Sequence, residues 1–128
     1  MALVLLDTSW CVEIMRGKPL PEKWRVHRFC ISSVVEAELW AGVYHSGGKE
    51  ERIKVEKLLA SVERVPFESK AAEAAGKILG ILAKEGKSIG DFDCQIAGHA
   101  LALNAHLATK NRRHFQRITA LKILANRQ

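Results

Sequence analysis

The sequence lacks any apolar run long enough to cross a membrane, although 48% of its 128 residues are hydrophobic. A transmembrane helix needs about 20 consecutive apolar residues. The apolar start of the chain, Met1 to Leu6, is also too short for a signal peptide and carries no basic segment. We therefore expect a cytoplasmic protein that does not associate with membranes.

Cysteine is scarce, and its spacing excludes the usual cysteine-based sites. The three cysteines, Cys11, Cys30 and Cys94, are an odd number and form no C-x-x-C pair. A disulfide framework or a zinc site would need paired or clustered cysteines. These residues are expected to be reduced side chains in the core.

Acidic residues are missing from the last part of the chain. Residues 1–93 contain all 14 acidic residues and 14 of the 20 basic ones, so their charges balance. The whole surplus of positive charge follows Asp93, and it indicates a polyanionic partner such as nucleic acid or an acidic protein segment. A solubilising surface is the alternative. The basic residues concerned are Lys110, Arg112, Arg113, Arg117, Lys122 and Arg127.

Short apolar segments alternate with longer helical patterns along the chain. Strands are expected at residues 3–6, 29–31, 62–67, 107–109 and 121–124, and helices at residues 9–15, 33–45, 50–59, 71–84, 91–104 and 112–115. Such alternation is typical of an α/β fold with parallel strands. We predict a three-layer α/β/α sandwich with a central, mainly parallel sheet, in a single domain over residues 1–128.

Two pairs of acidic residues occur two positions apart, so the members of each pair point in different directions on a helix. Ser33 and Glu36 have the spacing of a capping box, which would leave Glu38 free to project. Asp91 is expected to cap the next helix, with Asp93 in its first turn. An ordinary surface glutamate, and a carboxylate that only complements the helix dipole, remain the alternatives for Glu38 and Asp93.

Asp7 directly follows the first expected strand, where α/β proteins place their sites. Three carboxylates in one cleft (Asp7, Glu38 and Asp93) would repel each other unless a cation joined them. A few carboxylates with open water positions suit Mg²⁺ or Mn²⁺ better than zinc. The histidines His99, His106 and His114 lack ligand spacing and are expected to be surface or capping residues.

Four segments in order resemble the PIN domain superfamily and, within it, the VapC-type toxin ribonucleases. They are the N-terminal Leu-Leu-Asp-Thr, the Ser-Ser-Val-Val-Glu-Ala-Glu-Leu-Trp-Ala-Gly of residues 32–42, the Ile-Gly-Asp-Phe-Asp-Cys-Gln-Ile-Ala-Gly-His-Ala of residues 89–100, and the Leu-Ala-Thr-Lys-Asn of residues 107–111. The likeness extends over the whole chain.

The resemblance implies that Asp7, Glu38 and Asp93 are the catalytic, metal-binding acids. Where many relatives have a fourth acid, this chain has Asn111, which weakens the case for a second tightly held metal. Ser9, Thr109 and Asn111 would support the site, together with Asp91. The RNA backbone would be bound by Lys110, Arg112 and Arg113.

The implied activity is that of a Mg²⁺-dependent endoribonuclease, with Mn²⁺ as an alternative ion, that hydrolyses phosphodiester bonds in single-stranded or loop RNA. The family further implies the toxin of a type II toxin–antitoxin system, a homodimer, and a VapB-like antitoxin whose C-terminal segment packs in an apolar groove. Trp10, Trp24 and Trp40 are candidates for that groove or for the dimer face, and otherwise for the core.

Three other interpretations fit parts of the pattern. A receiver-like domain needs an acid at the end of the middle strand, where this chain offers only Glu68, and a haloacid dehalogenase phosphatase needs an aspartate where Ser9 stands. A catalytically weak PIN-like module that binds RNA or protein is the third.

Overall fold

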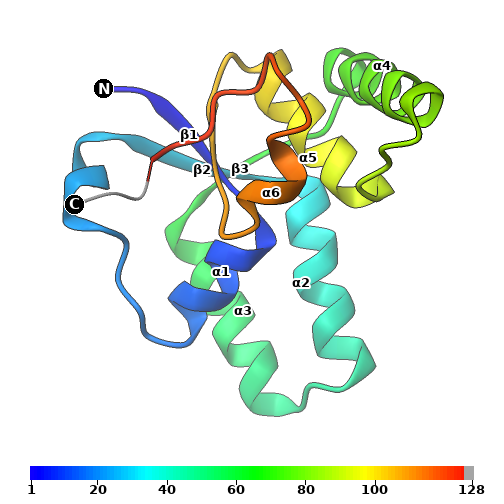
Figure 1. The fold of residues 1–128 in the computed structure, drawn as a ribbon. Helices are drawn as coiled ribbons and strands as arrows, with labels where there is room; N and C mark the ends of the chain where they lie inside the picture. Colours follow the sequence, from blue (N-terminus) through cyan, green and yellow to red (C-terminus); the bar gives the residue numbers. More distant parts are fainter. Residues whose placement is uncertain (126–128) are drawn as a thin grey trace.

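The structure is a computed structural model that describes residues 1–125. Its centre is a sheet in which all strand pairs are parallel, in the order β3-β2-β1-β4 (Figure 1). The strands are β1 (Leu3–Leu6), β2 (Arg28–Ser32), β3 (Glu63–Val65) and β4 (His106–Ala108). The predicted parallel sheet is confirmed.

Strand β1 lies inside the sheet and pairs with β2 on one side and β4 on the other. Val4 and Leu5 have no exposed surface, and Leu6 is 2% exposed. An uninterrupted apolar strand is what a parallel sheet buried on both faces requires. The parallel arrangement also brings the carboxyl ends of β1, β2 and β4 to the same edge of the sheet.

Helices flank this sheet, which confirms the predicted α/β fold. In Figure 1, α2 and α3 run side by side away from the sheet, and α4 lies against α5. A short 3-10 helix at Glu22–Val26 was not expected from the sequence. The α-helices are α1 (Thr8–Met15), α2 (Ser33–His45), α3 (Lys49–Ser61), α4 (Ser69–Glu85), α5 (Asp91–Ala102) and α6 (Arg112–Phe115).

The predicted capping box at the start of α2 is wrong. Ser32 is the N-cap, and its Oγ accepts a hydrogen bond from the backbone N–H of Val34. The Ser33 hydroxyl instead accepts from the backbone N–H of Phe67, in the chain after β3. Glu36 forms an ion pair with Arg64, at 3.0 Å. Contacts with a neighbouring part of the chain therefore take the two side chains that the box would have used.

The predicted cap at Asp91 is also wrong. Gly90 is the N-cap of α5, and Asp91 is an exposed residue of the helix itself. Gly90 has a φ of 103°, a conformation that favours glycine, and this turn sets the direction in which the helix begins.

The last predicted strand, residues 121–124, is reduced to a single parallel bridge between Leu107 and Ile123. Leu107 donates to the carbonyl of Lys122 and accepts from Leu124 N–H, each at 2.8 Å. Because β4 has only three residues, it offers little length for a longer ladder.

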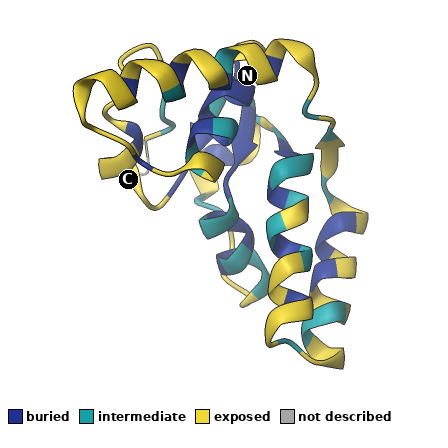
Figure 2. Cartoon of the chain, turned by 90° about the vertical axis from the view of Figure 1, so that its right-hand side faces the viewer, coloured by how far each residue is buried: buried dark blue, intermediate teal, exposed yellow. Residues whose placement is uncertain are grey.

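The buried residues face inward from every layer, and the outer helix faces are exposed (Figure 2). Cys11, Cys30 and Cys94 are buried and unpaired, as expected. Trp10 and Trp24 pack edge to face in the core, with ring centroids 4.9 Å apart. They belong to the core and not to a surface groove, whereas Trp40 is only half-buried.

No helix within residues 1–125 has both the length and the apolar composition to cross a membrane. Arg127, one of the basic residues of the C-terminal part, lies outside the described residues.

Candidate functional site

Asp7 directly follows β1 and is the N-cap of α1. Its Oδ1 accepts hydrogen bonds from the backbone N–H of Trp10, at 3.1 Å, and from the hydroxyl of Ser9, at 2.5 Å. Its Oδ2 accepts from the hydroxyl of Thr109, just beyond β4. Side chains that follow two neighbouring strands therefore fix the orientation of this carboxylate, which is 5% exposed.

Burial raises the pKa of Asp7 above its ordinary value, and the charge of Asp93 adds to this effect. The hydrogen bonds from Ser9, Thr109 and Trp10 act in the opposite direction and stabilise the charged form. A carboxylate that is buried, oriented and near another acid is suited to hold a cation, because the cation offsets both burial and repulsion.

Glu38 lies in the second turn of α2, which begins directly after β2. It is half-buried, and its Oε1 accepts a hydrogen bond from the Thr8 hydroxyl at 2.6 Å. Its pKa is raised mainly by burial and also by the charges of Asp93 and Asp7. Thr8 was not among the predicted site residues. Thr8 directly follows Asp7, so its hydrogen bond to Glu38 links the segment of the first acid to the second acid.

Asp93 lies in the first turn of α5 and is half-buried. Its Oδ2 is 3.2 Å from Nδ1 of His114, and the same Nδ1 is 2.9 Å from Nδ2 of Asn111. His114 is exposed, as expected, and it also lies beside an acid of the site. Its position three residues after Asn111 indicates nearness to Asn111, but no local pattern in the sequence indicates its contact with Asp93.

The three predicted acids thus lie close enough for their charges to interact. Within residues 1–125, however, no three His, Cys, Asp or Glu side chains form a group arranged to hold a metal ion. A closed zinc site therefore does not fit. A hard divalent ion fits better, because Mg²⁺ is commonly bound by one or two carboxylates and keeps several water ligands.

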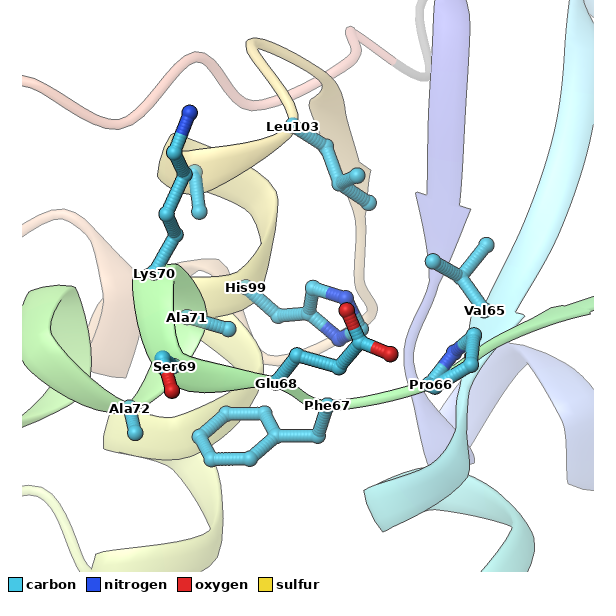
Figure 3. A pocket seen from close by; sticks show the side chains of 11 residues that line it. Val65, Pro66, Phe67, Glu68, Ser69, Lys70, Ala71, Ala72, His99 and Leu103 are labelled. Carbon is cyan, nitrogen blue, oxygen red and sulfur yellow. The ribbon is translucent and has the colours of Figure 1, made fainter.

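His99 is not a surface residue, contrary to expectation. It is 2% exposed, its Nδ1 is 2.8 Å from the Ser32 hydroxyl, and burial lowers its pKa. Figure 3 shows its side chain at a pocket between α5 and the chain after β3, with Phe67 beside it. The volume of this pocket is about 830 Å³. None of the three acids lines this pocket, so His99 takes no part in the acid cluster. Its contact with Ser32, the N-cap of α2, supports the start of that helix. His106, at the start of β4, is half-buried.

The basic residues predicted to bind RNA follow Thr109 and are all exposed. Lys110 has its Nζ 3.7 Å from Glu13 and 5.2 Å from the centre of the Trp10 ring. Arg112 donates to the carbonyl of Leu124 at 3.3 Å. Since Thr109 contacts Asp7, this segment lies at the rim of the acid site. Its role in RNA binding stays a prediction.

Comparison with known proteins adds a consistent set of relatives. The family model of the PIN domain matches residues 4–121. The tRNA(fMet)-specific endonuclease VapC of Shigella flexneri is 32% identical over 127 residues, which cover 95% of this chain and 96% of that protein. Ribonuclease VapC2 of Rickettsia felis is 36% identical over 131 residues, covering 97% of each chain.

Solved structures agree with these relatives. The crystal structure of DNA-bound VapBC from Salmonella typhimurium contains a chain that superposes with a TM-score of 0.87 at 31% identity, covering 97% of this chain and 98% of that one. VapBC2 from Rickettsia felis, bound to a promoter DNA fragment, gives a TM-score of 0.84 at 32% identity, covering 95% of this chain and 97% of that one. VapBC-1 from nontypeable Haemophilus influenzae gives the same TM-score and identity, covering 95% of this chain and 96% of that one.

Proposed function

Because this chain belongs to the PIN domain family, we propose that it is an endoribonuclease and the toxin of a type II toxin–antitoxin pair. The relatives that match nearly its whole length are named as ribonucleases or as a tRNA endonuclease. We further propose that it uses Mg²⁺, or Mn²⁺ in its place, to hydrolyse phosphodiester bonds in single-stranded or loop RNA.

The observation that carries this proposal is the convergence of Asp7, Glu38 and Asp93 at the carboxyl end of β1. The charge of Asp93 acts on both other acids, although the three come from widely separated parts of the chain. Buried carboxylates that repel each other destabilise a protein unless a cation binds between them. An acid cluster of this kind at the edge of a parallel sheet is a functional arrangement in an α/β protein.

The chain's own residues would divide the task as follows. Asp7, oriented by Ser9, Thr109 and the Trp10 amide, would bind the ion directly, and Asp93 would do so from the opposite segment. Glu38, held by Thr8, would complete the set or orient a water molecule. A bound Mg²⁺ would supply positive charge for the scissile phosphate and activate the attacking water.

The exposed basic residues beside this cluster, Lys110, Arg112 and Arg113, would bind the RNA backbone on either side of the cleaved bond. A single-stranded loop leaves its phosphates accessible and its bases free to unstack. Such a substrate could reach carboxylates that lie within a fold, where a regular duplex could not.

We also propose a VapB-like antitoxin partner and a homodimer. The solved relatives include VapBC complexes, which by name combine the two components. Of the tryptophans, only Trp40 remains a candidate for an apolar contact, because it is half-buried and lies next to the exposed ring of Tyr44.

The test is cleavage of labelled RNA during titration with Mg²⁺ or Mn²⁺, comparing the wild type with Asp7→Asn and Asp93→Asn. We expect metal-dependent cleavage by the wild type and its loss in both variants. The resemblance implied a supporting role for Asp91, but this residue is exposed in the first turn of α5, two residues from Asp93. Asp91→Asn is therefore the matched control and should keep the cleavage activity.

Equal cleavage by the wild type and both variants would overturn the nuclease proposal. Retention of RNA on the wild-type protein without cleavage at any metal concentration would favour the alternative function, a PIN-like binding module.

A further inference from the structure

We propose that His114 contributes an imidazole nitrogen to the metal site, so that this chain binds its ion through mixed nitrogen and oxygen ligands and favours Mn²⁺ over Mg²⁺. The inference rests on the proposed function, because it concerns the ion at the same acid cluster. The segment that follows β4 contains no acid, and there the side chain of Asn111 contacts His114.

The first observation is the position of the imidazole. His114 belongs to α6, the short helix that follows β4, and its Nδ1 lies 3.2 Å from Oδ2 of Asp93 on α5. The side chain of His114 is 46% exposed and that of Asp93 is 29% exposed, so this pair faces the open side of the cluster. An ion arriving from solvent could reach both atoms.

The second observation is that two polar side chains meet at the same ring nitrogen, Nδ1. A ring nitrogen has either one proton to donate or one lone pair to offer. Nδ1 of His114 nevertheless has Asp93 Oδ2 on one side and Asn111 Nδ2, at 2.9 Å, on another. If Nδ1 accepts from the Asn111 amide, a nitrogen and a carboxylate oxygen without a proton between them face each other. A cation would remove this conflict, because both atoms could then act as ligands.

The third observation is the separation itself. Two ligands bound at about 2.1 Å and at right angles around one ion lie about 3.0 Å apart. The Asp93–His114 distance of 3.2 Å is close to that value. The two atoms therefore need little rearrangement to share one ion.

A chain of contacts ties this pair to the first acid. Thr109 donates to Asp7, the Asn111 N–H donates to the Thr109 hydroxyl at 2.9 Å, and the Asn111 side chain meets His114. The segment after β4 thereby orients Asp7 and His114 together. This segment would therefore help to position both an oxygen ligand, Asp7, and a nitrogen ligand, His114.

The expected consequence is a change in metal preference. Mg²⁺ binds almost entirely through oxygen, whereas transition metals accept imidazole readily. One nitrogen ligand should thus raise the affinity for Mn²⁺ relative to Mg²⁺. Removal of a group that positions or ligates a metal commonly lowers affinity by about tenfold or more.

The test uses the full chain loaded with Mn²⁺ alone, without RNA. Bound Mn²⁺ is counted by the loss of the free-ion electron paramagnetic resonance signal, and Mg²⁺ competition gives the preference. Electron spin-echo modulation then detects nitrogen-14 bound to Mn²⁺. We expect nitrogen modulation in the wild type, its loss in His114→Gln with Mn²⁺ still bound, and a preference for Mn²⁺ about tenfold lower in that variant.

His45→Gln is the matched control, because His45 is exposed at the far end of α2 from Glu38. It should leave both the modulation and the preference unchanged. Mn²⁺ bound to the wild type without nitrogen modulation, or modulation that persists in His114→Gln, would overturn the inference.

The same experiment separates the two proposals. Metal-dependent RNA cleavage together with nitrogen-free Mn²⁺ would leave the proposed function standing and overturn the role of His114. Nitrogen-bound Mn²⁺ without RNA cleavage would do the reverse. Absence of any Mn²⁺ binding to the wild type would overturn the inference and the metal requirement together.

Discussion

At the scale of single residues, burial decides the chemistry of the three thiols. Burial raises the pKa of Cys11 to about 12 and that of Cys30 to about 11, and it also raises the pKa of Cys94. The nucleophilic form of cysteine is the thiolate, so all three should be unreactive in the folded protein.

We accordingly expect negligible reaction of the native protein with a thiol reagent at neutral pH, followed by labelling of three thiols in denaturant. The time course of absorbance with an aromatic disulfide reagent measures this. Rapid labelling of any cysteine before unfolding would show that its surroundings are more open than the structure indicates.

His99 should make the stability of the protein depend on pH. Burial lowers the pKa of His99 below the ordinary 6.5, so the unfolded chain binds a proton more readily than the folded one. The stability that His99 contributes as a neutral group is therefore complete above pH 6.5 and is lost as pH falls through that value.

Denaturant unfolding between about pH 7.5 and pH 5.5 should show this loss in the wild type and a smaller loss in His99→Gln. The variant should also be less stable throughout, because Ser32 loses its buried partner. His45→Gln serves as the control and should keep the wild-type slope. Identical slopes in His99→Gln and the wild type would contradict the assignment.

The acid cluster predicts the opposite sign. Burial and neighbouring charges raise the pKa of Glu38, so the contribution of Glu38 to the stability of the metal-free protein is complete below the unfolded-state value of 4.5 and is lost as pH rises through the raised value. Glu38→Gln should thus stabilise the metal-free protein at neutral pH, by roughly 0.5 kcal/mol after allowance for solvent screening.

Glu36→Gln provides the comparison, because it removes an ion pair with Arg64 and should leave stability unchanged or slightly lower. Denaturant unfolding in the presence of a chelator measures both. A Glu38→Gln variant less stable than Glu36→Gln at neutral pH would show that the Thr8–Glu38 hydrogen bond outweighs the repulsion.

At the scale of elements, the close contact between α4 and α5 depends on a glycine, Gly98. A Cβ built on Gly98 would lie 2.4 Å from the backbone nitrogen of Ala75, so the helices approach closely there. Gly98→Ala must push α4 away from α5, and overpacking of this kind costs about 1–3 kcal/mol. Since Asp93 lies on α5, we also expect weaker metal binding.

Gly80→Ala on α4 is the matched control, because nothing lies within 4 Å of its added Cβ. That change should stabilise the protein by about 0.5–1 kcal/mol, since alanine favours a helix interior. Thermal unfolding of the two variants measures the difference, and equal stabilities would contradict the close contact.

The sequence predicted the elements better than their ends. Apolar periodicity is local, so within residues 1–125 the four strands of the sheet and the six α-helices appear in the expected places. Helix caps depend on contacts with distant parts of the chain. Ser33 contacts the chain after β3 and Glu36 pairs with Arg64, and a local sequence pattern reveals neither contact.

The sequence likewise predicted some residues of the site and missed others. Asp7 could be located because a carboxylate directly after a buried strand marks the edge of a parallel sheet. Thr8 and His114 could not, because each contacts an acid from a distant segment, Glu38 in one case and Asp93 in the other. Spacing within a chain identifies which residues share an element, whereas these contacts arise only when elements pack.

At the scale of the whole molecule, charge is divided between two parts of one site. The acids come from the first 93 residues, and the surplus of bases comes from the segment after Asp93. Thr109 joins the two, since it donates to Asp7 and immediately precedes Lys110. A polyanion bound by the basic segment would therefore have its backbone beside the carboxylates.

RNA binding should consequently depend strongly on salt and on this segment. In the metal-free protein, where cleavage does not interfere, Arg113→Ala should weaken binding of single-stranded RNA to a similar extent for different sequences. It should also reduce the slope of log affinity against log salt concentration by about 0.7, the value for one phosphate contact with a single strand.

The control is Lys84→Ala, because Lys84 is an exposed cation near the end of α4. This change removes the same charge outside the basic segment and should leave the slope almost unchanged. Fluorescence anisotropy over a range of salt concentrations distinguishes the two. Equal slopes for Arg113→Ala and the wild type would mean that RNA approaches the carboxylates from another side, and that the basic residues after Thr109 serve solubility or bind an acidic protein segment instead.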